Sequence, residues 1–160
     1  MDFRKESLIT DGFQEFMSVH DIRIDYKTVP RTKGVYIVYR ESLDKPDFAE
    51  KGPGGFFKNK DPNVSADTLW KNWIDTANVL YIGQTGSSLR GRIRLYMRFG
   101  NGEPVAKRGG RLIWQLRDAE NLLIAYKELP NYIPREYEIY LLNEFRLQNN
   151  GKLPFANLAR

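Results

Sequence analysis

The chain contains no cysteine and only one histidine, His20, among its 160 residues. Without cysteine, neither a disulfide framework nor a thiolate metal site can form, and a single histidine cannot build an imidazole cluster. Any bound metal ion must therefore use oxygen ligands. Oxygen ligands suit hard cations, so magnesium or manganese is the expected metal.

Long apolar runs are also missing, since no stretch approaches the roughly 20 apolar residues that a membrane span requires. The N-terminal residues are charged and include no apolar run of the kind found in signal peptides. We therefore expect a cytoplasmic protein without a membrane partner, either a monomer or a homodimer. The length and the ample apolar content favour a single domain, residues 1–160, with one core.

The net charge of +5 is distributed unevenly. Residues 84–117 include eight lysines and arginines against one acidic residue, Glu103. A basic segment on an otherwise slightly acidic chain favours a face that binds a polyanion. Charge alone leaves a solvated basic helix as an equal alternative.

Three segments have the composition of β-strands: Lys33–Arg40, Val79–Gly83 and Leu122–Lys127. Residues 1–33 form an N-terminal extension, in which Gly12–Phe16 is expected to pack locally. Residues 41–78, rich in proline and glycine, form an insertion between the first two strands. The predicted fold class is α/β (α+β): a small, largely antiparallel three-stranded sheet flanked by helices.

Three helices are predicted from capping signals. Ser65 caps a short helix that reaches Trp73, and Ser87 or Ser88 caps a helix that ends near Phe99. Pro134 opens the last helix, which runs to about Asn149. A further helical turn is expected at residues 111–117, and the tryptophans at 70, 73 and 114 are expected in the core.

Helical periodicity separates two kinds of arginine in the helix ending near Phe99. Arg92 and Tyr96, four residues apart, border its apolar stripe. The stripe consists of Leu89, Ile93 and Met97, and the outward side carries Arg90, Arg94 and Arg98. In the last helix, Glu138 shares the inward face with Leu141, Leu142 and Phe145.

Two tripeptides, Gly34–Tyr36 and Tyr81–Gly83, each place a phenol beside a glycine within a predicted strand. Together with Arg92, Tyr96 and Glu138, and with Asn157 near the C-terminus, they resemble the motifs of the GIY-YIG nuclease family. The resemblance covers residues 34–40 and 79–157. The insertion at 41–78 is longer than in minimal members, and one extra residue separates Tyr81 from Arg92.

The resemblance implies a metal-dependent endonuclease that hydrolyses the phosphodiester bonds of DNA. Its catalytic residues would be Tyr36, Tyr81, Arg92, Tyr96 and Asn157. Glu138 would hold one Mg²⁺ or Mn²⁺ ion, and Arg92 would bind the non-bridging phosphate oxygens. Tyr36 would take a proton from water once a cation lowers its pKa, although the sequence leaves open which tyrosine is the base.

The expected partner is nucleic acid, most readily double-stranded DNA. The residues proposed to bind it are Lys58, Lys60, Arg90, Arg94, Arg98, Arg108 and Arg111. The glycine-rich stretch 52–60 fits a DNA-clasping loop with a stacked phenylalanine, or else a packed connector over the sheet edge. Two other functions stay open: an inactive nucleic-acid-binding module of the same fold, and a nuclease directed at RNA.

Overall fold

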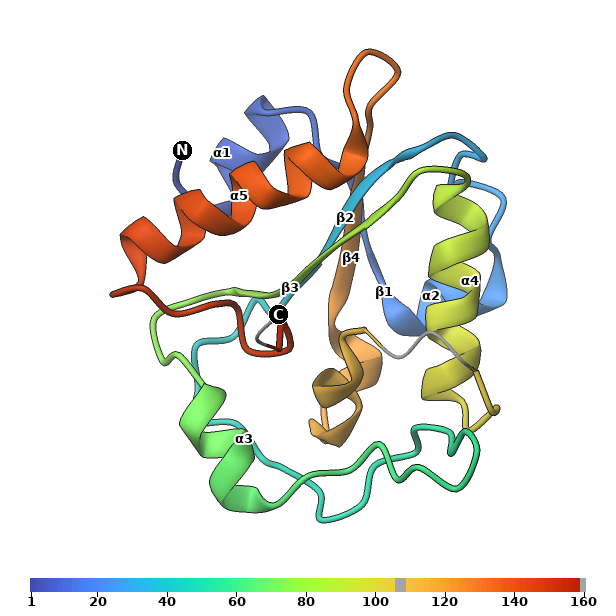
Figure 1. Ribbon diagram of the computed structural model, residues 1–160, viewed down its shortest axis with the longest axis vertical. Coiled ribbons are helices and arrows are strands. Elements are labelled where there is room, and N and C mark those ends of the chain that lie inside the picture. The colour runs from blue at the N-terminus through green and yellow to red at the C-terminus, as the bar shows by residue number, and fades with distance from the viewer. Residues whose placement is uncertain (106–108, 159–160) are drawn as a thin grey trace.

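The structure is a computed structural model that describes residues 1–105 and 109–158. Its centre is a four-stranded sheet in the order β1-β4-β2-β3, with every neighbouring pair antiparallel (Figure 1). The strands are β1 (Gln14–Ser18), β2 (Gly34–Tyr39), β3 (Val79–Thr85) and β4 (Leu123–Glu128). The mixed α and β class and the antiparallel sheet agree with the sequence prediction.

The prediction of three strands is wrong, because β1 in the N-terminal extension pairs with β4 and adds a fourth. This strand could not be recognised from the sequence because its pairing is irregular. The register shifts between Gln14 and Met17, and Glu15 and Phe16 both have positive φ angles, 79° and 41°. Such a bulge removes the alternation of apolar and polar residues by which a strand is recognised.

In the described residues, five α-helices and two 3₁₀ turns surround the sheet. The α-helices are α1 (Lys5–Thr10), α2 (Val19–Ile24), α3 (Ala66–Asn72), α4 (Leu89–Gly100) and α5 (Pro134–Gln148). The 3₁₀ turns are η1 (Arg111–Gln115) and η2 (Ala119–Asn121). Ser65 and Ser88 cap α3 and α4 through their hydroxyls, and Pro134 opens α5, all as predicted. None of the helices in the described part of the chain is long and apolar enough to cross a bilayer.

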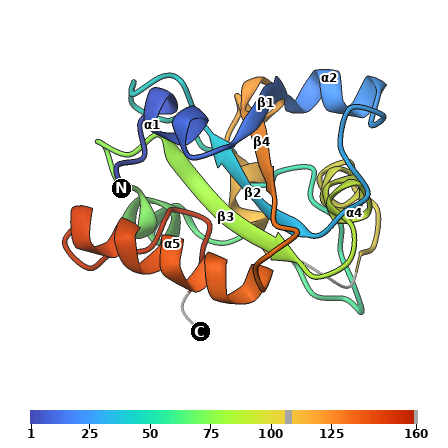
Figure 2. The same cartoon turned by 90° about the horizontal axis from the view of Figure 1, so that it is seen from above.

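Helices α4 and α5 cover opposite faces of the sheet (Figure 2). Alternation along β2 decides which side chain meets which helix. Tyr36 and Val38 join the core cluster of α4, whereas Val35 and Ile37 join that of α5. The phenol of Tyr36 therefore lies on the α4 face of the sheet.

The predicted insertion, residues 41–78, packs as a long connector that includes α3 and runs from the sheet to the end of α4 (Figure 1). Its aromatic centre is Phe48, whose ring centroid lies 4.9 Å from Trp70 and 5.8 Å from Trp73. Trp73 and Trp114 are buried as predicted. Trp70 is 42% exposed, so the prediction that it lies in the core was wrong. Trp70 still packs edge-on against Phe48.

Candidate active site

Three predicted tyrosines meet on the α4 face of the sheet. Tyr36 comes from β2, Tyr81 from β3 and Tyr96 from α4. Their ring centroids lie 6.0 Å (Tyr36–Tyr81), 6.3 Å (Tyr36–Tyr96) and 5.7 Å (Tyr81–Tyr96) apart. These separations are typical of interacting aromatic rings. We refer to this group as the tyrosine cluster.

A glycine makes room for the first of these rings. In the antiparallel register, Gly83 lies directly opposite Tyr36. A Cβ atom at position 83 would stand 2.5 Å from Cζ and 2.7 Å from the hydroxyl oxygen of Tyr36. No side chain fits at that distance, so the phenol can cross the neighbouring strand only where that strand carries glycine.

Arg92 brings a positive charge to the tyrosine cluster from the first turns of α4. Burial raises the pKa of Tyr36 well above its ordinary value. The neighbouring Tyr81 raises that pKa further, and the charge of Arg92 lowers it without cancelling the effect of burial. Tyr36 is thus a neutral hydrogen-bonding group at physiological pH, adjacent to a guanidinium.

Tyr96 is hydrogen-bonded to the segment that begins at Gly109, within the basic stretch. Its hydroxyl donates a hydrogen bond of 2.7 Å to the carbonyl oxygen of Gly110, and its ring packs edge-on against Trp114. A Cβ atom at Gly109 would lie 2.7 Å from the Tyr81 hydroxyl, and one at Gly110 would lie 2.6 Å from the Tyr96 hydroxyl. Gly109 and Gly110 therefore lie directly over the phenols.

The tyrosine cluster is closed to solvent, with exposed fractions of 2% for Tyr36, 8% for Tyr81 and 4% for Tyr96. Arg92, by contrast, is only half-buried and contributes to a hollow of about 490 Å³. The hollow is lined by Thr85, Ser87, Ser88, Gly91, Arg92, Arg94, Leu95 and Arg98. Three guanidiniums and three hydroxyls give it the chemistry of an anion-binding site.

The hydroxyls of this hollow were not among the predicted site residues. Ser88 was recognised only as a helix cap, and its hydroxyl does accept a hydrogen bond from the Gly91 N–H. Ser87 and Thr85 lie within hydrogen-bonding distance of each other, 3.2 Å apart. The sequence did contain a signal for these hydroxyls. Serines directly precede an arginine-rich helix, and this composition suits contacts with phosphate.

Asn157 does not point into the tyrosine cluster. Its side-chain amide oxygen accepts a hydrogen bond of 2.8 Å from the Ile82 N–H, and its amide nitrogen donates one of 2.9 Å to the Ile82 carbonyl. The adjacent Ala156 N–H donates to Leu80. The C-terminal segment thus pairs with the outer edge of β3 and fixes the strand that carries Tyr81.

Glu138 lies on α5 and is only 4% exposed. Within the described residues it is the one buried carboxylate, and no cluster of three histidine, cysteine or acidic side chains accompanies it there. A carboxylate is the donor that Mg²⁺ prefers, and water or phosphate oxygens complete such shells. Helix α5 packs on β3, and its apolar residues join the core on the face of the sheet opposite to the tyrosine cluster, so Glu138 lies on a helix of that other face.

The predicted nucleic-acid ligands differ in their surroundings. Arg94 and Arg98 are exposed, and so are Lys58 and Lys60 in the insertion. Arg90 was predicted to face solvent, but it is half-buried and donates to the carbonyls of Val29 at 2.8 Å and Lys27 at 2.9 Å. The other two predicted ligands are Arg111, which is half-buried, and Arg108, which lies outside the described residues.

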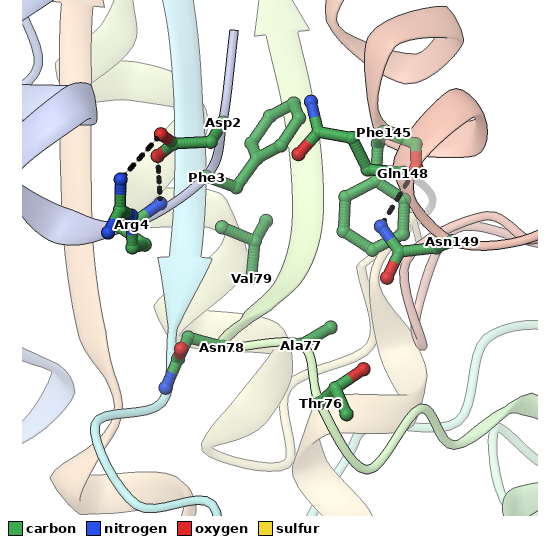
Figure 3. Close-up of a pocket in the computed structure, with 10 residues that line it drawn as sticks. All are labelled: Asp2, Phe3, Arg4, Thr76, Ala77, Asn78, Val79, Phe145, Gln148 and Asn149. Carbon is green, nitrogen blue, oxygen red and sulfur yellow. Dashed lines mark hydrogen bonds and ion pairs between the residues drawn. The ribbon is translucent and has the colours of Figure 1, made fainter.

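A second hollow, of about 340 Å³, lies at the N-terminus and the end of α5, remote from the predicted residues (Figure 3). Arg4 and Asp2 form an ion pair there, which holds the pKa of Asp2 well below its usual range. The Asn149 amide bonds to the carbonyl of Phe145. These polar groups bond one another rather than converge on the space, so the candidate site is the one at Arg92.

The chain matches no family model, no curated protein and no solved structure at a significant level.

Proposed function

We propose that the chain is a metal-dependent endonuclease of the GIY-YIG type that hydrolyses phosphodiester bonds of double-stranded DNA in the cytoplasm. One observation carries the proposal: Tyr36 of β2, Tyr81 of β3 and Tyr96 of α4 converge beside Arg92, which lines a basic hollow. Taken singly, a tyrosine in a strand or an arginine on a helix means little. Convergence of all four in the order of the motif is the stronger signal.

Arg92 is the residue that would meet the substrate. A phosphate in the hollow lined by Arg92, Arg94 and Ser88 would receive hydrogen bonds from guanidinium and hydroxyl groups. The charge on the non-bridging oxygens grows in the transition state, so a fixed guanidinium stabilises that state more than the ground state. Arg92 therefore has the role of electrostatic stabiliser.

The tyrosines act as hydrogen-bonding groups at the start of the reaction. With its pKa raised by burial, Tyr36 keeps its proton at neutral pH, so it could act as a base only if a further positive charge nearby lowered that pKa and released the proton. A magnesium ion held by Glu138 would supply that charge and lower the pKa of its bound water. Tyr81 and Tyr96 fix the position of the Tyr36 ring and of the Gly109–Gly110 segment.

A second function, a nucleic-acid-binding module without turnover, is favoured by one specific observation. All three phenols are buried, and Gly109 and Gly110 cover two of them. A chain that only binds phosphate through the hollow would need no access to these phenols. The two functions share the arginines and differ in whether a bond is broken.

Plasmid nicking separates the two functions. Purified wild-type protein is incubated with supercoiled plasmid and Mg²⁺ or Mn²⁺, beside Arg92→Ala, Glu138→Gln and the control Arg146→Ala. Arg146 lies exposed on α5, and Arg146→Ala removes one positive charge, as Arg92→Ala does. We expect wild type and Arg146→Ala to nick, and each of the other two to lose about 100-fold or more in rate.

The contrary results are equally clear. Binding without nicking by wild type would leave the binding module as the function. Equal nicking by all four proteins would mean that the activity does not come from this site. Nicking by wild type that needs no divalent ion would remove Glu138 and its metal from the mechanism.

A further inference from the structure

The tip of the insertion, residues 51–60, carries three lysines and no acidic residue. It lies at the C-terminal end of α4, the helix that carries the arginines of the hollow (Figure 1). The proposed mechanism makes no use of this segment. Its attachment, its strain and its one exposed aromatic side chain together point to a ligand.

Two glycines fix the tip to the end of α4. The Gly55 N–H donates a hydrogen bond of 2.9 Å to the carbonyl of Phe99. A Cβ atom at Gly55 would stand 1.9 Å from the carbonyl oxygen of Glu103, and one at Gly54 would touch the ring of Phe99 at 3.4 Å. The chain is therefore held directly against the last turn of the helix at this point.

Phe56 follows this anchor immediately and is 51% exposed. Phe57, the next residue, is half-buried, with the Lys58 ammonium 5.5 Å from its ring centre. A large aromatic side chain half-open to water gains little stability from its position. Its exposure beside two fixed glycines suits a side chain that contacts a binding partner.

The turn after Phe57, which carries the two exposed lysines, has a strained backbone. Lys58 and Asn59 have φ angles of 51° and 61°, and the Lys60 N–H donates to the Phe57 carbonyl at 3.0 Å. Two consecutive positive φ angles within such a turn define type I′, which usually takes glycine or asparagine. A lysine in this conformation costs stability, and strain of this kind is often retained at functional positions.

We propose that Phe56, with Lys58 and Lys60, forms a second nucleic-acid contact that stacks on an unpaired base. This inference rests on the nucleic-acid substrate of the proposed function. An exposed aromatic flanked by cations is the arrangement that binds single strands, because a base supplies a π-face and its backbone supplies negative charge. A base within an intact duplex is already stacked on both sides and offers no free face.

The position of the tip relative to the hollow sets where the unpaired base lies. Arg92 and Phe99 are seven residues apart on α4, about 10 Å at a rise of 1.5 Å per residue. That length corresponds to about three steps of a B-form strand. The substrate class is therefore DNA with unpaired bases a few nucleotides from the phosphate at Arg92, such as a flap, a bulge or a frayed end.

Binding is measured by fluorescence anisotropy in EDTA, so that cleavage does not interfere. The probes are a fluorescein-labelled single strand of about 16 nucleotides, its blunt duplex, and the duplex with one unpaired end. Wild type is compared with Phe56→Ala, with Phe56→Tyr, which keeps the aromatic ring, and with the control Tyr132→Ala. Tyr132 is also exposed, at 59%, but precedes α5.

Phe56→Ala is expected to weaken binding to the single strand and to the frayed duplex by about fivefold to a hundredfold, the loss of one base stack. Binding to the blunt duplex should change less than twofold. Phe56→Tyr and Tyr132→Ala should bind all three probes as wild type does. Equal affinity of wild type and Phe56→Ala for the single strand would overturn the inference.

Two further outcomes are decisive. Loss of binding to phosphatidylserine vesicles by Phe56→Ala, with DNA binding intact, would assign the tip to a lipid surface instead and overturn the inference. A protein that never nicks plasmid but needs Phe56 for single strands would keep this contact while the endonuclease proposal fails. The two proposals can therefore fail separately.

Discussion

The side-chain amide of Gln115 hydrogen-bonds both backbone groups of Val64. Its oxygen accepts from the Val64 N–H at 2.9 Å, and its nitrogen donates to the Val64 carbonyl at 3.0 Å. The same nitrogen reaches the carbonyls of Ala49 at 3.2 Å and Glu50 at 3.3 Å. Gln115 is 2% exposed, so one buried amide ties both limbs of the insertion to η1.

Replacing Gln115 by alanine should destabilise the protein by about 3 kcal/mol, because buried backbone groups of the insertion lose their partners. The free energy of unfolding is measured by urea denaturation beside the exposed control Gln14→Ala. Hydrogen exchange should show that the Val64 amide loses protection in Gln115→Ala. An unchanged urea midpoint would mean that the insertion is held by its aromatic contacts alone.

Introducing a methyl group at Gly83 should force Tyr36 out of its place. The new Cβ would lie 2.5 Å from Cζ of Tyr36, so we expect Gly83→Ala to cost about 1–3 kcal/mol and to reduce nicking. The matched control is Gly86→Ala, whose Cβ would meet no atom within 4 Å. Thermal denaturation and plasmid nicking are the measurements.

The double variant Gly83→Ala/Tyr36→Ala tests whether Gly83→Ala lowers stability through contact with the Tyr36 ring. If the added methyl group acts on the phenol, the double variant loses less stability than the sum of the two single variants. Strict additivity, or a Gly83→Ala protein as stable as Gly86→Ala, would contradict the close approach of the ring to the glycine.

Much of the arrangement of the tyrosine cluster and of α4 could be predicted from local sequence signals. The strands that contain Tyr36 and Tyr81 are continuous apolar runs, and Ser88 caps α4 as a serine before a helix should. Once those elements are placed, periodicity alone puts Arg92 and Tyr96 at the edge of the apolar stripe. The predictions that succeeded depend on residues within one element.

The features that could not be predicted depend on contacts between distant segments. A helical wheel places Arg90 outward, but it carries no information on the carbonyls of Lys27 and Val29, which draw the guanidinium back. The partners of Gln115 lie 51 to 66 residues away. The bulged strand β1 has no periodic pattern, so its pairing with β4 follows from tertiary packing alone.

The buried phenols predict how stability depends on alkaline pH. Burial raises the pKa of both Tyr36 and Tyr96 well above the ordinary value near 10. Below that pH the folded and unfolded chains both keep these protons, so the contribution to stability is fully present. Above it the unfolded chain releases protons that the folded chain retains, and the free energy of unfolding falls by up to about 1.4 kcal/mol per pH unit for each phenol.

Urea denaturation between pH 8 and about pH 11 measures this dependence. Tyr96→Phe should show a shallower decline above pH 10 than wild type, because it removes a buried phenol whose pKa is raised well above the ordinary value. Tyr132→Phe, which removes an exposed phenol, is the control for the loss of a hydroxyl group. Parallel curves for wild type and Tyr96→Phe would show that the Tyr96 phenol titrates normally in the folded protein.

Arg90→Ala should differ from Arg94→Ala and Arg98→Ala in how strongly its DNA binding depends on salt concentration. Arg94 and Arg98 are exposed beside the hollow, so replacing either by alanine should weaken binding to all DNA sequences. Each loss should also make the slope of log K against log salt shallower by about 1. Arg90 instead donates to two backbone carbonyls, so Arg90→Ala should leave that slope unchanged.

Arg90→Ala should reduce stability, because the carbonyls of Lys27 and Val29 lose a charged donor, and we expect a cost of about 1–3 kcal/mol. Anisotropy titrations across a salt series, with urea denaturation of the same proteins, test both effects. A salt slope that falls equally in all three variants would place Arg90 on the phosphates as well. Because each variant removes one positive charge, any difference among them reflects position and not net charge.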